Sequence, residues 1–373
     1  MARFWITSAG LALGWLLVDP EPLAGWGPAT HVALGEALLN ALYFLPPALR
    51  ALLERFPIHF LYGSVAADIS FAKKYVPEGR HSHSWEVGEE ILEAAPNEAL
   101  KAAAYGYLAH LAADTLAHNV FIPRKLFLTR TGQAHGHTYW EHRMDLKVGE
   151  EFMGKARRLV MNYDHSEADE LFDSVLSRTL FSFRTNRRIF RGMIQVQDND
   201  RWKQVFDKVL ESSRYELSAE RVESYLATSF DFVVDYLVSR GESRPRELDP
   251  VGALNLRIAK KLRRAGLAEG GYDDPAVLEE LVERFFPFPE GPLLYWPKVK
   301  AQERRQLTPG TEVLNGLSSP LADAEAGDES EPTEERLVPG GAAREEGVRG
   351  EAANGEGAPD SSVEDEARAG SQK

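Results

Sequence analysis

Apolar residues recur at helical spacing along most of the chain between residues 30 and 300. Positions three and four residues apart predict helices over 30–38, 47–54, 85–94, 98–121, 166–180, 200–213, 218–240, 254–265 and 275–285. No segment alternates between apolar and polar residues over six or more positions, and no motif repeats at a fixed period. The sequence therefore predicts an all-α fold, a multi-helix bundle of the kind that holds metal or cofactor sites between facing helices.

The helix expected over 98–121 has a defined beginning and end. Asn97 precedes it, and an asparagine side chain at that position can accept a hydrogen bond from a backbone N–H of the first turn. Ala and Leu dominate its length. Pro123 follows, and we expect it to stop the helix because proline lacks the N–H that would continue the ladder.

The N-terminal residues 1–25 have the pattern of a signal peptide. Arg3 precedes an apolar run over 4–18, which Asp19 and Pro20 end. As a helix this run would span only about 22 Å, which is less than the ~30 Å hydrocarbon core of a bilayer. The small residues Ala24 and Gly25 suit cleavage after Gly25. We expect an exported protein, periplasmic or extracellular, with an uncleaved N-terminal anchor as the alternative.

Charge is distributed unevenly along the chain. The formal charge is −14, from 43 Lys and Arg against 57 Asp and Glu. Residues 307–373 hold sixteen of the acids and five of the bases, so −11 of that charge lies there and the rest of the chain carries only −3. This end is rich in Gly, Pro, Glu, Ser and Ala and has no aromatic residue, so it buries too little apolar surface to offset the entropy of ordering. We therefore expect a disordered acidic tail over 301–373.

The chain contains no cysteine. This excludes disulfides, a cysteine nucleophile and a cysteine-based metal site. Any zinc bound by this protein must be held by histidine, by carboxylates or by backbone groups.

Seven of the ten histidines fall between residues 81 and 142. Within the Ala-rich helix, His110, Asp114 and His118 are spaced four residues apart, which puts all three on one stripe of the helix. The neighbouring apolar residues would bury this stripe. A buried, unpaired carboxylate costs several kcal/mol, whereas a divalent cation satisfies all three groups together.

A second pair with the same spacing follows at His137 and Glu141. Imidazole and carboxylate ligands without thiolate suit Zn²⁺ or a similar first-row ion. Further candidate ligands are His31, Asp68 and His83. Histidines are also common as hydrogen-bonded core residues, and we interpret the remaining ones as residues beside the site or on the surface (His81, His135, His142) and as structural or solvated residues (His59, His165).

These residues, taken in order along the chain, resemble the zinc-dependent phospholipase C family. The ordered set is Trp26, His31, Asp68, His83, His110-x3-Asp114, a later histidine, and His137-x3-Glu141. The resemblance covers about residues 26–142, and it implies a helical, zinc-dependent phospholipase C-like domain over 26–300. The family shares its all-α, three-zinc fold with the fungal single-strand nucleases.

The resemblance also implies which residues bind the three zinc ions. Asp68, His83, His110 and Asp114 would hold the first ion. Asp114 would bridge to the second, which is bound by His31 and by the amino nitrogen and carbonyl oxygen of Trp26. The third would be held by His118, His137 and Glu141. In this scheme Trp26 is the mature N-terminus, since only cleavage after Gly25 frees its amine, and Asp68 is the candidate general base.

Two positions leave alternatives open. Family members usually place the next ligand six residues after the bridging aspartate, whereas His118 follows Asp114 by four, so His135 is the alternative to His118. The interval after Asp68 also fits His81 in place of His83.

The function implied by the resemblance is hydrolysis of a phospholipid at a membrane surface, with release of the phosphorylated head group by a metal-activated water. A nuclease or nucleotidase with the same three-zinc site is the alternative, and the short Trp26–His31 interval resembles the nucleases. No track of aromatic and basic residues for nucleic acid is evident beside the ligands, so nucleic acid is not favoured as a partner. A third possibility is a non-catalytic, metal-stabilised envelope protein.

Overall fold

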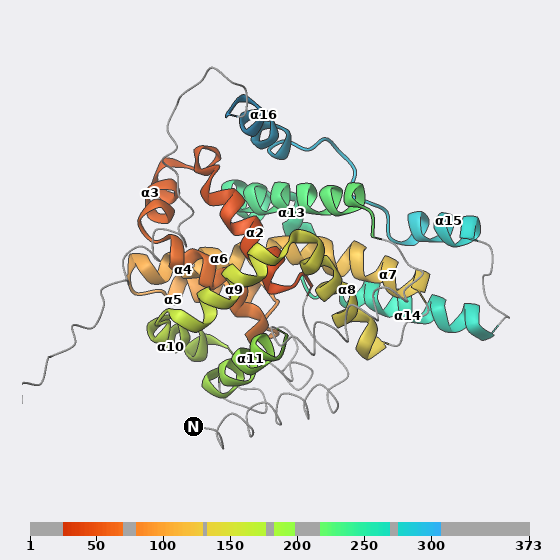
Figure 1. Ribbon diagram of the computed structural model, residues 1–373, viewed down its shortest axis with the longest axis horizontal. Coiled ribbons are helices and arrows are strands. Elements are labelled where there is room, and N and C mark those ends of the chain that lie inside the picture. Colours follow the sequence, from red (N-terminus) through yellow and green to blue (C-terminus); the bar gives the residue numbers. More distant parts are fainter. Residues whose placement is uncertain are drawn as a thin grey trace, which may run out of the picture. The chain divides into compact units, whose positions relative to one another are not determined.

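The computed structural model describes residues 25–69, 80–129, 133–176, 183–197, 217–268 and 275–306. These residues form helices joined by turns and contain no β-strand, which confirms the prediction of an all-α fold (Figure 1). The expected signal peptide before Gly25, the expected helix over 200–213 and the acidic tail beyond Gln306 lie outside the described residues. None of the helices that the structure describes is long and apolar enough to span a bilayer.

The helices follow one another with short connections. Those in the first half are α2 (Pro28–Leu39), α3 (Pro47–Arg55), α4 (Pro57–Ala66), α5 (Trp85–Ala94), α6 (Glu98–Leu116), α7 (Ile122–Thr129), α8 (Gln133–Val148) and α9 (Glu150–Asn162). Those in the second half are α10 (Ser166–Val175), α11 (Phe183–Gln197), α13 (Ala219–Ser239), α14 (Ala253–Ala268), α15 (Pro275–Phe285) and α16 (Trp296–Gln306). Short 3₁₀ turns lie at Leu42–Phe44, Ala67–Ile69, Arg240–Glu242 and Arg244–Glu247. Helix α16 therefore continues past residue 301, where the sequence predicted the tail to begin.

Helix α6 packs against α4, α5 and α13 and is buried along nearly its whole length (Figure 1). Asn97 caps it as predicted, since its side-chain oxygen accepts a hydrogen bond from the Leu100 N–H at 2.9 Å. Helix α4 was not predicted because it is almost uniformly apolar and lacks the polar face that gives an amphipathic pattern.

Two glycines let the backbones of α4 and α6 touch. A Cβ atom on Gly63 would lie 1.9 Å from the carbonyl oxygen of Ala103, and one on Gly106 would lie 2.0 Å from that of Phe60. Neither position can hold any other residue without moving a helix. This close approach brings the end of α4, with Ser64 and Asp68, against the histidine stripe of α6.

The expectation that Pro123 ends the helix is wrong. After α6 the chain passes through one π-helical stretch, Ala117–Phe121, and continues directly into α7, which contains Pro123. Proline leaves the carbonyl oxygen of Asn119 without its usual partner four residues on. The side-chain amide of Asn255 donates a hydrogen bond to this oxygen at 3.1 Å. A tertiary contact thus satisfies the group that the proline exposes.

The second half of the chain packs on the same core as the first. The indole of Trp26 lies between Phe121 and Tyr225, and its Nε1 donates to the Ala113 carbonyl at 3.1 Å and to the Ser229 hydroxyl at 3.0 Å. Tyr225 and Ser229 belong to α13. Trp26 is fully buried by residues from both halves.

Candidate metal centre

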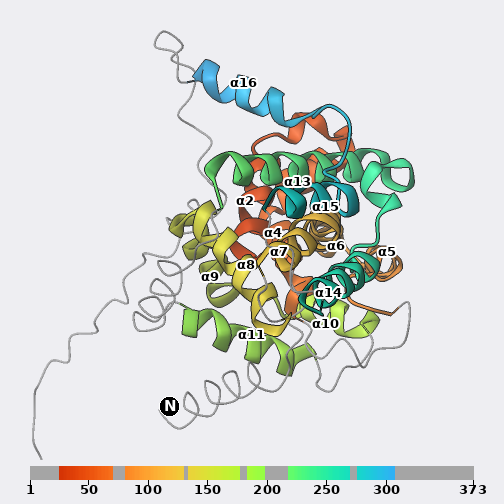
Figure 2. The same ribbon diagram turned by 90° about the vertical axis from the view of Figure 1, so that its right-hand side faces the viewer.

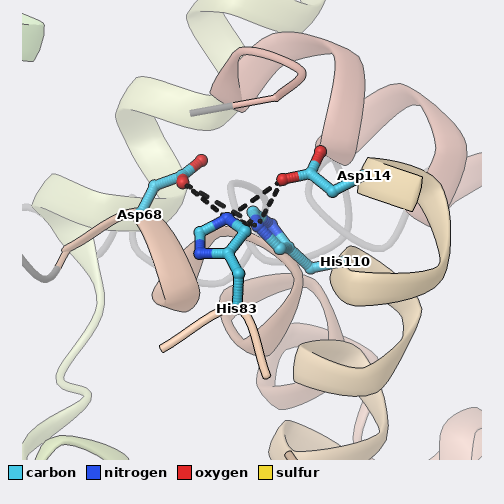
Figure 3. A group of neighbouring side chains, drawn as sticks. All are labelled: Asp68, His83, His110 and Asp114. Carbon is cyan, nitrogen blue, oxygen red and sulfur yellow. Dashed lines mark hydrogen bonds and ion pairs between the residues drawn. The ribbon is translucent and has the colours of Figure 1, made fainter. Parts of the chain in front are cut away.

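Four of the predicted ligands meet in one buried group (Figure 3). Each of them offers one donor atom, and these atoms all lie within 4.8 Å of one another; the residues are Asp68, His83, His110 and Asp114. Asp68 comes from the 3₁₀ turn after α4, His83 from the turn before α5, and the other two from α6. All four side chains are buried.

The donor atoms converge closely. Nε2 of His83 lies 3.0 Å from Nε2 of His110, and these nitrogens lie 3.0 and 3.1 Å from Oδ2 of Asp114. Oδ1 of Asp68 lies 3.3 Å from the His83 nitrogen and 3.8 Å from the His110 nitrogen. Two imidazole nitrogens between two carboxylates form a compact set of nitrogen and oxygen donors, the set that zinc prefers where no thiolate is present.

Backbone contacts fix the orientation of the His110 ring. Nδ1 of His110 lies 2.8 Å from the carbonyl oxygen of Ser64. Because a carbonyl can only accept, Nδ1 carries the hydrogen and the lone pair of the neutral ring is on Nε2, which faces the group. An imidazole ligand held in this way by a carbonyl is the usual arrangement around bound metals. Together, the donor types, the burial and the ring orientation fit a divalent cation such as zinc.

Charge within the group favours the ligand form of Asp114. Burial works to raise the pKa of this carboxyl, but His110 and His31 outweigh it and hold the pKa well below its usual range. Burial works in the opposite direction on His110, where the carboxylates of Asp114 and Asp68 prevail and raise the pKa. The pKa of His31 is lowered by burial and by the neighbouring His110. Asp114 is therefore ionised and can bind a cation through both oxygens.

The two oxygens of Asp114 face different partners. Oδ2 faces His83 and His110, whereas Oδ1 lies 3.3 Å from Nε2 of His31 and accepts a hydrogen bond from the Trp26 N–H at 3.0 Å. The His31 ring stacks on that of His110, with 3.9 Å between ring centroids. The residues predicted to hold the second ion thus lie on the far side of the carboxylate that was predicted to bridge.

The third predicted set is also assembled. Nε2 of His137 lies 3.0 Å from Oε1 of Glu141 on α8. The ring of His118 lies 5.6 Å from that of His137 and 5.6 Å from that of His83. His118 stands in the π-helical stretch, and its Nδ1 donates to the carbonyl oxygen of Pro250 at 2.5 Å, which leaves Nε2 as the potential ligand. The side chain of His135, the alternative to His118, lies outside the described residues.

Comparison with protein families yields one match. A family model described as zinc dependent phospholipase C covers residues 30–189. These residues belong to the zinc-dependent phospholipase C family. Comparison with curated proteins and with solved structures gives no significant match. Family membership implies a zinc-dependent hydrolase of phosphodiesters, and the matched region contains every predicted ligand except Trp26.

Other histidines in or near the phospholipase C region support the site or lie apart from it. His81, the alternative to His83, accepts a hydrogen bond on Nδ1 from the backbone N–H of His83 at 3.0 Å, so it steadies the turn that carries His83. His165 is buried far along the chain, stacked on Tyr62 with 3.6 Å between ring centroids. His59 is half-buried beside Phe56.

Sequence reasoning missed one buried carboxylate in the phospholipase C region. Asp145 lies four residues beyond Glu141, so it extends the stripe of His137 and Glu141 by one turn, a spacing that was visible in the sequence. Its carboxylate accepts hydrogen bonds from the N–H of Ala29, the N–H of Thr30 and the Thr30 hydroxyl, at 3.1, 3.0 and 2.7 Å. Burial raises the pKa of Asp145 to about 6. Asp145 therefore caps α2 and fixes the segment between Trp26 and His31.

Proposed function

We propose that this protein is a phospholipase C that hydrolyses the phosphodiester of phospholipids at a membrane surface with three zinc ions. The observation that carries the proposal is the position of Asp114, whose two oxygens face two separate groups of nitrogen donors. A carboxylate between two such groups is suited to bridge two cations. The family match over residues 30–189 supports the same chemistry.

The residues assign themselves to three groups around Asp114. Asp68, His83 and His110 share the first ion with it, and His31 and Trp26 share the second. His118, His137 and Glu141 hold the third. Bound at these positions, zinc would neutralise the charge of a phosphodiester and lower the pKa of a bound water toward neutrality.

Asp68 is the best candidate for the general base. It is the one carboxylate of the first group that is carried by a short turn and not by α6, and it is buried. Its Oδ1 lies 3.3 Å from the nearest imidazole nitrogen. From this position it would orient a water for in-line attack on phosphorus and accept its proton, while the α6 residues keep their orientation.

Cleavage after Gly25 would complete the second group. The Trp26 nitrogen lies 3.0 Å from Oδ1 of Asp114. As a peptide amide this nitrogen has no lone pair for a cation, whereas the amine freed by cleavage has one. We infer that the protein is exported and that its mature form begins at Trp26. N-terminal sequencing of the exported protein tests this, and a different first residue would contradict the assignment of the second zinc site.

The substrate is tested with one purified, zinc-loaded sample. We expect it to release phosphorylated head group from phosphatidylcholine, to leave single-stranded DNA intact, and to lose activity in a chelator. Cleavage of DNA without lipid hydrolysis would favour the nuclease alternative. Bound zinc without hydrolysis of either substrate would favour a metal-stabilised envelope protein.

A further inference from the structure

Helix α14 carries a concentrated positive charge. Its sixteen residues, Ala253–Ala268, include five cations and no acid, and the cations are Arg257, Lys260, Lys261, Arg263 and Arg264. No acidic side chain one turn away can neutralise them within the helix. The charge contrasts with the rest of the chain, whose overall charge is negative.

The outward face of α14 combines three of these cations with an apolar residue. Arg257, Lys261 and Arg264 are exposed, and so is Leu254, with 63% of its surface accessible. At ~100° per residue these four positions fall within about 80° of arc, so they form one stripe. We call these residues the α14 stripe. A large exposed leucine at one end of a basic stripe is typical of helices that lie in a membrane interface.

The opposite face of α14 is fixed to the body. Ala259 and the half-buried Ile258 and Leu262 pack against Phe127 of α7 and against α15 (Figure 2). The Arg257 side chain bonds only within its own helix, through Nε to the Ala253 carbonyl. The α14 stripe is therefore presented outward by a helix that is anchored on its other side.

The leucine end of the α14 stripe lies close to the candidate metal centre. Leu254 follows Gly252 by two residues, and a Cβ atom on Gly252 would be 2.4 Å from the backbone oxygen of His118. The Asn255 amide donates to Asn119, the next residue after His118. A surface that touches the α14 stripe would thus be held next to the third group of ligands.

We propose that the α14 stripe docks the protein on membranes that contain anionic phospholipid. The proposal rests on the proposed lipid hydrolysis and adds the surface that brings the site to its substrate. Cations near an anionic bilayer contribute about 1 kcal/mol each, and Leu254 would enter the interface beside them. Nucleic acid would also attract the cations, but it offers no apolar layer for an exposed leucine.

Vesicle binding of the intact zinc-loaded protein tests this surface. We compare sedimentation with vesicles of phosphatidylcholine alone and of phosphatidylcholine mixed with phosphatidylglycerol. Replacing the three exposed cations (Arg257→Gln, Lys261→Gln, Arg264→Gln) should weaken partitioning onto the mixed vesicles about 100-fold, from ~1 kcal/mol per cation. Leu254→Ser should weaken it less, and added salt should reduce the binding of the unchanged protein.

A matched control removes the same charge from scattered positions. Lys101, Lys147 and Lys298 are exposed and lie on different elements. Their replacement by Gln should leave binding to the mixed vesicles within about twofold, because the α14 stripe is intact. Equal loss in the two triple variants would overturn the proposal, since net charge alone would then explain binding. So would a loss of DNA binding in the α14 variant with unchanged vesicle binding.

Hydrolysis of a monomeric short-chain phosphatidylcholine separates docking from catalysis. The α14 triple variant should hydrolyse this soluble lipid at the unchanged rate while it loses activity on mixed vesicles. Vesicle binding that depends on the α14 stripe without hydrolysis of any lipid would contradict the proposed function and leave the docking surface standing. Hydrolysis of soluble lipid with vesicle binding that ignores the stripe would contradict the docking surface alone.

Discussion

The imidazole of His118 donates a hydrogen bond to the carbonyl oxygen of Pro250 at 2.5 Å, although 132 positions separate the two residues. The family match ends at residue 189, so Pro250 lies well outside it. The turn that carries Pro250 is held in place in its own right, because Asp249 accepts a hydrogen bond from the Asn119 amide through its carbonyl oxygen at 2.8 Å. The candidate site of the phospholipase C region therefore depends on a segment that the family match does not include.

Gly252→Ala should disturb the third group of ligands selectively. Gly252 has a positive φ of 62°, and a Cβ there would lie 2.4 Å from the His118 backbone oxygen, so the turn must move away from His118. We expect the variant to lose about one zinc ion per chain and to fall in stability. Zinc content by plasma mass spectrometry and unfolding in urea measure the two effects.

Gly149→Ala is the control for backbone strain. Gly149 also has a positive φ, of 123°, but a Cβ there would meet nothing within 4 Å. It should lose stability and keep its full zinc content. Loss of zinc in both variants would mean that strain, and not the contact with His118, is responsible.

Asp114→Asn should remove two zinc ions and nearly all activity. The amide keeps the size of the carboxylate but cannot supply an anionic oxygen to each of the two groups that face Asp114. Zinc analysis and head-group release from phosphatidylcholine measure the outcome. Full zinc content in this variant would contradict the bridging role.

Asp231→Asn separates loss of metal from loss of a buried carboxylate. Asp231 is fully buried on α13 and accepts the N–H groups of Tyr295 and Trp296, away from the metal centre. It should destabilise the protein by roughly 1–3 kcal/mol and leave zinc binding unchanged. A similar loss of zinc here would show that metal content follows general stability.

Asp145→Ala should loosen the second group of ligands. Its removal leaves the buried N–H groups of Ala29 and Thr30 without their acceptor, which costs roughly 3 kcal/mol, and frees the segment that carries Trp26 and His31. We expect weaker binding of one zinc ion with the first group intact, measured by zinc titration. Asp145→Asn, which keeps one acceptor oxygen, should fall between the variant and the unchanged protein.

The sequence predicted the register of the site because that register is local. Spacings of four residues place His110 with Asp114, and His137 with Glu141, whatever the rest of the chain does. The interruption at Ala117–Phe121 was not predictable, because the partner of the freed Asn119 carbonyl is Asn255, far along the chain. The same is true of Pro250 beside His118. Asp145 differs, since its spacing from Glu141 was visible but its role depends on α2.

Stability should fall between pH 6.5 and 4 because of His165. Burial lowers the pKa of His165 from 6.5 to about 4, and Arg187 adds to this, while Nε2–H donates to the Leu159 carbonyl at 2.7 Å. The unfolded chain binds a proton near pH 6.5 and the folded protein does so only near pH 4. The stabilisation is thus complete above pH 6.5 and is lost as the pH falls, by roughly 3 kcal/mol in all.

The comparison of two variants isolates this term. His165→Gln should be less stable at pH 7, since it loses the stack on Tyr62, and its free energy of unfolding should fall less steeply from pH 6.5 to 4. Phe172→Leu, beside the same tyrosine, should lose stability but keep the slope of the unchanged protein, because no titrating group is removed. Because the metal ligands titrate in all three proteins, their contribution cancels in the difference. An unchanged slope in His165→Gln would show that His165 is protonated in the folded protein well above pH 4.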